Sequence, residues 1–235
     1  MKELALVMPV YNEEACIREV IQSWLEELTR LKINFYILVL NDGSRDNTEE
    51  ELRHFDGYKG IRIINGHNNG HGPTILFGYH MAIEEAPWVF QVDSDNEIRP
   101  DHFEALWEKR NDYDGLFGNR QKRTQETDRK LVSLLARGLI RFLFGKGVKD
   151  PNVPYRLMRS VCLKKIILKI PIGTFAPNII ISGAFALQKL RICNHPMTCW
   201  GRATGTTKLA SWKIWRSAVL SFLQTFEARY KLRKL

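Results

Sequence analysis

Two carboxylates lie one residue apart at Asp93-Ser94-Asp95, directly after the apolar run 88–92. In a strand, residues i and i+2 point to the same side, so both carboxylates can converge on one hard cation where the strand opens into a loop. A cation held there would bind the oxygens of a diphosphate. The alternative is an acidic turn, because Asp bonds its own backbone and favours helix N-termini.

Strand-like and helix-like segments alternate around this pair. The strand-like runs are residues 4–10, 35–40, 61–64 and 88–92. The helix-like segments are residues 17–28, 46–51 and 75–83, and a further helix opens at Pro100-Asp101. This order predicts an α/β fold with a mostly parallel sheet and helices on both faces. Ligands bind beyond the carboxyl ends of such strands, so Glu13, Asp42 and the Asp93/Asp95 pair should gather at one edge.

The composition is that of a globular chain of 235 residues, with 44% hydrophobic and 26% charged residues. A net charge of +9 indicates an anionic partner, which leaves nucleic acid, an anionic membrane and phosphorylated small molecules open. The four cysteines lack metal-ligand spacing, which favours a reduced cytosolic protein.

Neither a signal peptide nor a transmembrane helix is expected. The apolar run that follows Met1 ends at Pro9, too early for a signal peptide. No uninterrupted apolar stretch reaches the roughly 18 residues that a spanning helix needs. The sequence therefore predicts a cytoplasmic protein.

The second half of the chain is basic. Residues 120–141 interleave arginine and lysine with leucine, which is typical of a solvated amphipathic helix. Residues 209–235 place Trp212, Trp215, Phe222 and Phe226 at helical spacing among basic residues. Such a helix suits a membrane interface, but it could equally pack on the sheet or on another subunit of a homo-oligomer.

Three segments jointly resemble family 2 glycosyltransferases of the GT-A fold in their order and approximate spacing. They are Pro9-Val10-Tyr11-Asn12-Glu13, Asn41-Asp42-Gly43-Ser44 and Asp93-Ser94-Asp95. Looser matches in the second half are similar to the polyprenyl-phosphate group typified by dolichyl-phosphate mannose synthase. These are Gly118-Asn119-Arg120, Arg129 with Ser133, Asp150 with Tyr155-Arg156-Leu157, and 202–208. The expected organisation is a GT-A domain over residues 1–208 and an amphipathic C-terminal helix over 209–235.

The resemblance implies a donor site for a nucleotide-diphosphate sugar. Pro9, Tyr11 and Glu13 would border the nucleoside, and Asp42 would accept hydrogen bonds from base or ribose. Asp93, with Ser94, would lie toward the nucleotide sugar. Asp95, with Glu97 where the group often has Gln, would hold Mg²⁺ or Mn²⁺. A second departure is Asn41, which replaces a more usual acidic residue.

The resemblance also implies an acceptor site and an inverting, single-displacement transfer of a hexose. A polyprenyl phosphate is already an ionised nucleophile, so it needs cations to position it and no general base. The residues that resemble the group's phosphate-handling set are Arg120, Arg129, Ser133 and Lys208, with Arg202 beside them. If the acceptor were instead a sugar hydroxyl of a surface polysaccharide or glycolipid, Asp150 would be the base to test.

The sequence leaves three other hypotheses open. His67 and His71 are four residues apart, but they lie in the glycine-rich stretch 65–72, which favours a loop before a helix over a metal site. The basic balance alone would suit a nucleic-acid-binding module, although no RNA-binding signature or helix-turn-helix pattern accompanies it. A catalytically silent scaffold at the membrane surface is a third reading.

Overall fold

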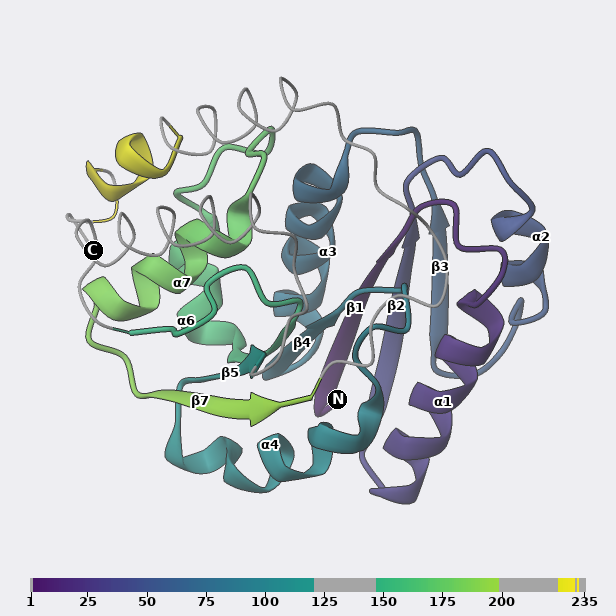
Figure 1. Cartoon of the computed structure of the whole chain (residues 1–235), viewed down its shortest axis with the longest axis horizontal. Coiled ribbons are helices and arrows are strands. Elements are labelled where there is room, and N and C mark those ends of the chain that lie inside the picture. The colour runs from purple at the N-terminus through teal and green to yellow at the C-terminus, as the bar shows by residue number, and fades with distance from the viewer. Residues whose placement is uncertain (1, 121–146, 199–223, 231, 233–235) are drawn as a thin grey trace.

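A seven-stranded sheet with helices packed against it forms the described part of this computed structural model, residues 2–120, 147–198, 224–230 and 232 (Figure 1). The elements of the first half are β1 (Leu4–Val10), α1 (Ile17–Arg30), β2 (Phe35–Asn41), α2 (Thr48–Arg53), β3 (Ile61–Asn65), α3 (His71–Glu85), β4 (Trp88–Val92), η1 (Pro100–His102), α4 (Phe103–Lys109) and η2 (Arg110–Asp112). Those of the second half are β5 (Gly115–Arg120), β6 (Tyr155–Arg159), α6 (Ser160–Ile167), α7 (Pro177–Leu187), β7 (Ile192–Met197) and a helical segment over 224–230.

The strand order is β3-β2-β1-β4-β6-β5-β7. Neighbours pair in parallel except at β6, which runs antiparallel to both β4 and β5. The predicted α/β fold with a mostly parallel sheet is confirmed, and β5, β6 and β7 are strands that the sequence patterns did not indicate. Two reversals in succession leave β5 pointing the same way as β4.

The order in which strands are added to the sheet reverses between β1 and β4. The chain winds outward from β1 through β2 to β3 and then returns to place β4 on the other side of β1. The register sets Val10 beside Asn41 and Asn41 beside Asn65, so the three strands end in one row. A switch point of this kind opens a crevice beyond the carboxyl ends of the strands.

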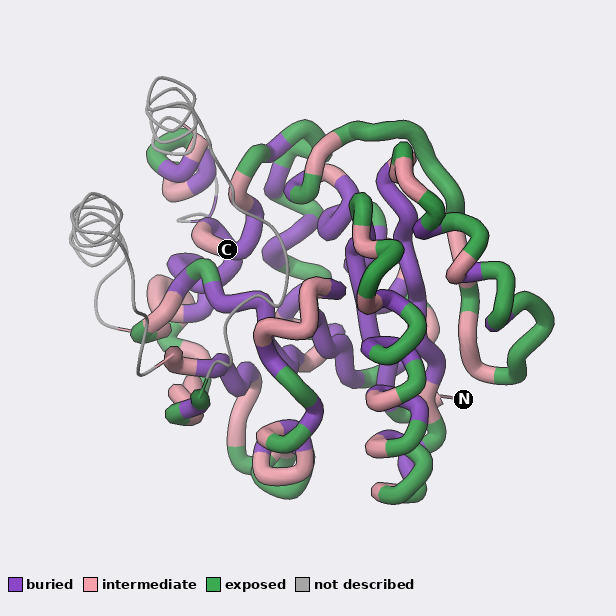
Figure 2. Tube along the Cα trace, turned by 45° about the vertical axis from the view of Figure 1, so that its right-hand side comes forward, coloured by how far each residue is buried: buried purple, intermediate pink, exposed green. Residues whose placement is uncertain are grey.

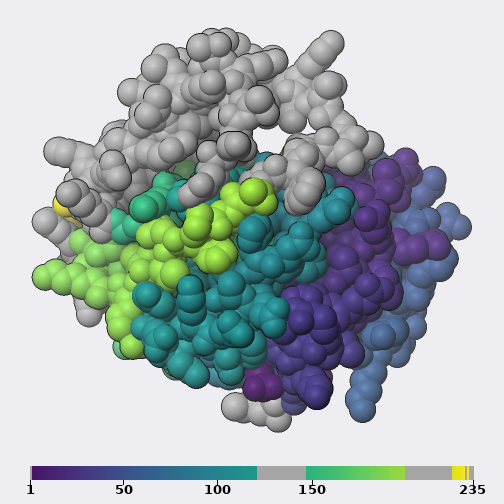
Figure 3. Space-filling view, turned by 60° about the horizontal axis from the view of Figure 1, so that its bottom comes forward, coloured from purple at the N-terminus to yellow at the C-terminus, as the bar shows by residue number. Residues whose placement is uncertain are grey.

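Apolar side chains cover both faces of the sheet. On one face Trp24 of α1 lies 5.2 Å from the ring centroid of Phe90 and 5.6 Å from that of Phe103, which locks α1, β4 and α4 together. Figure 3 shows α1 and α4 side by side on this side of the molecule. On the opposite face α3 approaches closely, because a Cβ on Gly78 would meet Val7 Cγ1 at 2.5 Å. The buried residues accordingly follow the central strands and α3 (Figure 2).

None of the helices in the described ranges combines the length and the apolar character needed to cross a bilayer.

Gly72→Ala tests how tightly the start of α3 is packed. A Cβ at this position would overlap the backbone carbonyl oxygens of Thr174 and Phe175, which cannot yield as a flexible side chain would. We expect the free energy of unfolding, measured by urea denaturation, to fall by about 1–3 kcal/mol. Gly173→Ala is the matched control, because a Cβ there meets nothing within 4 Å. Equal unfolding midpoints for the two variants would contradict the close contact.

Candidate active site

A cavity of about 380 Å³ opens at the carboxyl ends of β1, β2 and β4. Its lining residues are Pro9, Val10, Tyr11, Glu13, Asp42, His71, Thr74, Asp93, Ser94 and Asp95. The structure thus brings together every residue that the sequence placed at the nucleoside and the diphosphate, apart from Glu97. Their individual roles remain predictions.

Asp42 anchors the loop between β3 and α3. Its Oδ1 accepts a hydrogen bond from the backbone N–H of Asn69 at 2.8 Å, and its Oδ2 accepts one from Gly70 at 2.9 Å. The side chain is almost fully buried at this point. Because a carboxylate offers about four lone-pair sites, it can still accept a hydrogen bond from a ligand. Asp42 therefore shapes the cavity wall in addition to facing the cavity.

Reciprocal hydrogen bonds join the loops after β1 and β2. The Asn12 backbone N–H donates to Ser44 Oγ at 3.0 Å, and the Arg45 N–H donates back to Asn12 Oδ1 at 2.8 Å. Asn41 Oδ1 accepts from the Ser44 N–H at 3.1 Å, while its Nδ2 donates to Asn65 Oδ1 at 3.0 Å. An amide can both donate and accept, which a carboxylate cannot. Asn41, the departure from the family pattern, thus ties the ends of β2 and β3 together.

Asp93 follows β4 directly and is a partly buried carboxylate whose side chain is 25% exposed. Burial raises its pKa above the usual range, and the charge of Asp95 acts in the same direction. The charges of His71 and Arg120 and a hydrogen bond from Gln91 oppose this rise. His71 Nε2 lies 3.8 Å from Asp93 Oδ1. These opposing contributions offset part of the rise, and the pKa of Asp93 stays above its usual value.

Asp95 and Glu97 lie in the loop that follows, where the Glu97 backbone N–H donates to Asp95 Oδ1 at 3.1 Å. Within the described ranges, no three His, Cys, Asp or Glu side chains form a metal-ligating group. Carboxylates are nevertheless suitable ligands, because Mg²⁺ is commonly held by one or two of them together with substrate phosphates, and Mn²⁺ also favours oxygen ligands. The residues present fit a cation that is shared with a diphosphate.

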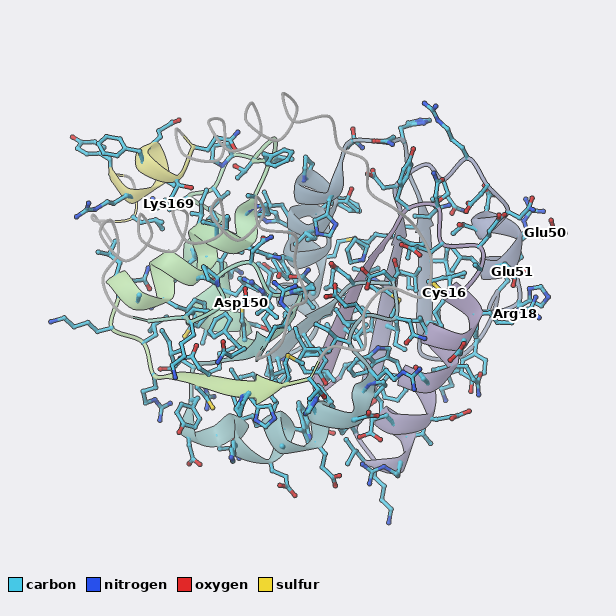
Figure 4. The ribbon with its side chains drawn as sticks, viewed as in Figure 1. Cys16, Arg18, Glu50, Glu51, Asp150 and Lys169 are labelled. Carbon is cyan, nitrogen blue, oxygen red and sulfur yellow. The ribbon has the colours of Figure 1, made fainter. Side chains whose placement is uncertain are left out.

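Cys16 links the first loop to the loop that carries Asp95. Its Sγ lies 3.4 Å from both Glu13 Oε2 and the carbonyl oxygen of Ser94, at the start of α1 (Figure 4). Burial, followed by the charge and hydrogen bond of Glu13, raises the pKa of this thiol to about 12. A thiol held in this way is protonated and donates a hydrogen bond rather than acting as a nucleophile.

Arg120 and Asp150 form an ion pair beside the cavity. Arg120 Nε donates to Asp150 Oδ2 at 2.7 Å and Nη2 donates to Oδ1 at 3.1 Å. The side chains are only 6% and 21% exposed. The arginine predicted to hold a phosphate is thus oriented by the carboxylate predicted as base for a hydroxyl acceptor. Arg129, Ser133, Arg202 and Lys208 lie outside the described residues, as do most of residues 209–235.

His71 and Thr74 line the cavity, and the sequence patterns gave neither of them a role there. The patterns indicated a loop at 65–72, whereas the structure starts α3 at His71 and places its ring on the cavity near Asp93. The available signal was its position directly after Gly70, where a loop at a strand's carboxyl end gives way to the helical pattern.

Comparisons with known proteins agree with this geometry. The family model described as glycosyl transferase family 2 matches residues 5–169. An uncharacterized glycosyltransferase of Synechocystis sp. is 33% identical over 92% of this chain and 67% of its own length. The undecaprenyl-phosphate 4-deoxy-4-formamido-L-arabinose transferase of Edwardsiella ictaluri is 26% identical over 90% of this chain and 64% of its own. The chain thus spans about two thirds of the length of these curated relatives.

Among solved structures, the fold is similar to that of glucosyl-3-phosphoglycerate synthase from Mycobacterium tuberculosis in complex with Mn²⁺, UDP-glucose and phosphoglyceric acid. The TM-score is 0.70 at 16% identity, over 97% of this chain and 80% of that one. At this identity the likeness concerns the fold alone, and it confirms the predicted GT-A architecture.

Asp42→Asn tests the loop anchor. Asparagine has one acceptor oxygen, so its NH₂ group would face the backbone N–H of Asn69 or Gly70 and leave a donor unpaired. We expect the free energy of unfolding in urea to fall by about 1–3 kcal/mol. Asp56→Asn, at an exposed position, is the control. A loss no larger than that of the control would show that the loop does not depend on Asp42.

The reactivity of Cys16 tests the environment of its thiol. Because only the thiolate reacts and its pKa is raised to about 12, alkylation by iodoacetamide at pH 8 should be much slower than for an ordinary cysteine. Glu13→Gln removes a negative charge beside the sulfur and should speed the reaction. Peptide mass spectrometry follows the Cys16 peptide by itself. An unchanged rate in Glu13→Gln would contradict the contact with Glu13.

Proposed function

The chain belongs to glycosyl transferase family 2, and on that basis we propose that it transfers a hexose from a nucleotide-diphosphate sugar to a polyprenyl phosphate, with inversion in a single displacement. The observation that carries the proposal is the cavity at the switch point. There, loops from three strand ends bring Glu13, Asp42 and the Asp93/Asp95 carboxylates to one wall.

The donor half of the proposal assigns the two carboxylates different tasks. Asp95, with Glu97, would hold Mg²⁺ or Mn²⁺, and the cation would stabilise the charge that develops on the leaving diphosphate. Asp93 would orient the nucleotide sugar. Pro9, Tyr11 and Asp42 would bind the nucleoside, and Cys16 would hold Glu13 in place. The Mn²⁺ and UDP-glucose in the similar synthase structure support a donor of this class.

The acceptor half depends on Arg120. Asp150 holds its guanidinium in one orientation at the end of β5, beside the donor carboxylates. A phosphate acceptor needs such a cation and no base. Relatives named as undecaprenyl-phosphate transferases support this acceptor class. Arg129, Ser133, Arg202 and Lys208 would complete the phosphate site.

Peripheral contact with the cytoplasmic face of an anionic membrane would give access to such a lipid. In the helical segment 224–230, Phe226 and Tyr230 are four residues apart and 59% and 69% exposed. Aromatic residues on one helical face suit a membrane interface, and the net charge of +9 favours anionic lipids.

A donor and acceptor panel tests the function. UDP, GDP and dTDP sugars are incubated with Mn²⁺ or Mg²⁺, with a short polyprenyl phosphate or with a sugar hydroxyl acceptor. We expect glycosylated polyprenyl phosphate from one donor class, detected by mass spectrometry, and no product in EDTA. Product formed only with the hydroxyl acceptor would overturn the proposal and favour Asp150 as base.

Asp95→Ala tests the cation site in the same assay. Loss of a ligand to a cation that stabilises the leaving group should reduce transfer at least ~100-fold, while the unfolding midpoint stays close to that of the wild type. Asp56→Ala, at an exposed position, should transfer normally. Full activity in Asp95→Ala would refute the metal assignment.

A further inference from the structure

Two buried polar residues behind the cavity have no part in the roles proposed above. Gln91 lies in the middle of the sheet on β4 and Tyr79 lies on α3, and both are fully buried. Burying a polar group costs free energy unless it is hydrogen-bonded. Tyr79 Oη lies 2.7 Å from Gln91 Oε1, and Gln91 Nε2 lies 3.3 Å from Asp93 Oδ1. The two residues thus connect α3 to the carboxylate at the cavity.

The contacts define the orientation of the Gln91 amide. Gln91 turns its NH₂ group toward Asp93, where Nε2 donates to Oδ1, and its carbonyl oxygen toward Tyr79. That oxygen then requires a donor, which the Tyr79 hydroxyl supplies. Without the hydroxyl, the Gln91 amide has no such partner to hold its orientation.

Neighbouring groups hold Gln91 and Tyr79 in place. Gln91 pairs across the strands with Arg156, which is fully buried. Arg156 Nη1 donates to the carbonyl oxygen of Asn178 at 3.0 Å, and Asn178 Oδ1 lies 3.3 Å from Tyr79 Oη. Residues locked by packing and hydrogen bonds in this way can keep a reacting group oriented before the ligand binds.

We propose that Tyr79 and Gln91 are positioning residues of the donor site, which hold the Asp93 carboxylate in the orientation that receives the nucleotide-diphosphate sugar. This inference rests on the proposed function, in which Asp93 faces the donor. It predicts that hydroxyl and amide groups outside the cavity control donor binding without touching the donor.

The chain contains a matched control for the Tyr79 hydroxyl. Tyr36 on β2 is also buried, at 5% exposure, and its Oη hydrogen-bonds to none of the described residues. Tyr79→Phe and Tyr36→Phe therefore each remove one hydroxyl group from a buried tyrosine. Only Tyr79→Phe removes a hydrogen bond that leads, through Gln91, to Asp93. Gln91→Glu keeps the side-chain size but turns an acceptor toward Asp93.

The experiment measures nucleotide binding separately from transfer. Calorimetric titration of the full chain with UDP, GDP and dTDP in Mn²⁺ identifies the nucleotide and gives its Kd. We expect Tyr79→Phe to weaken binding about tenfold and Gln91→Glu about a hundredfold, in keeping with hydrogen bonds to a charged group. The kcat/KM for the matching donor should fall in parallel, the KM for polyprenyl phosphate should not change, and Tyr36→Phe should behave as the wild type.

If Tyr79 had a purely structural role, Tyr79→Phe would lower the unfolding midpoint but would have the same nucleotide Kd and donor kcat/KM as Tyr36→Phe. That result would overturn the inference. If Tyr79→Phe does not fold, the Gln91→Glu variant tests the positioning role by itself. Nucleotide binding by Gln91→Glu with the wild-type Kd would overturn the inference. A wild-type chain that binds a nucleotide but glycosylates no polyprenyl phosphate refutes the proposed acceptor, while the binding comparison still decides the positioning role. A wild-type chain that binds none of the nucleotides refutes both.

Discussion

Asp93 is a partly buried carboxylate directly after the central strand β4, and several groups of the site compensate for its partial loss of contact with water. Burial disfavours the ionised form, so the fold must supply donors and positive charge to retain it. Gln91 supplies a donor from the adjoining strand, Arg120 supplies positive charge from β5, and the ring of His71 on α3 lies 3.8 Å from the carboxylate. Each compensating group comes from a different element, so the ionised site requires the assembled sheet.

The antiparallel strand β6 brings the ends of β4 and β5 to the same edge of the sheet. It separates β4 from β5 and reverses direction relative to both, so the carboxyl end of β5 returns to the edge where β4 ends. Arg120, the last residue of β5, therefore lies near Asp93. The same strand sets Arg156 opposite Gln91 in the register. Burial lowers the pKa of Arg156, but the charges of Asp150 and Asp93 oppose that shift and help to keep the guanidinium ionised.

The sequence predicted which residues meet at the cavity edge, because the information there is local. Run 88–92 matches β4 in full, and parallel strands joined by helices must end on one side, which places Glu13, Asp42 and Asp93 together. The neighbourhood of Arg120 and Asp150 was harder to predict, because β6 pairs with β4 across more than sixty residues and no periodic pattern marks that pairing. Gln91 was a polar residue in an apolar run, but its need for Tyr79 becomes visible only when α3 is packed on the sheet. The roles of Arg129, Ser133, Arg202 and Lys208 stay predictions.

Under the proposed function, the donor and acceptor halves of the site differ in how far they are organised before a ligand binds. On the donor side, loops after β1, β2 and β3 are joined by hydrogen bonds through Asn12, Asn41 and Asp42, so a nucleotide would meet a wall that is already formed. On the acceptor side, Arg120 is engaged by Asp150, which carries a single negative charge. A phosphate monoester carries between one and two charges and three strong acceptor oxygens, so it can compete for the same guanidinium. Under the proposed function, donor binding relies on rigidity, whereas acceptor binding relies on an exchange of anionic partners at Arg120.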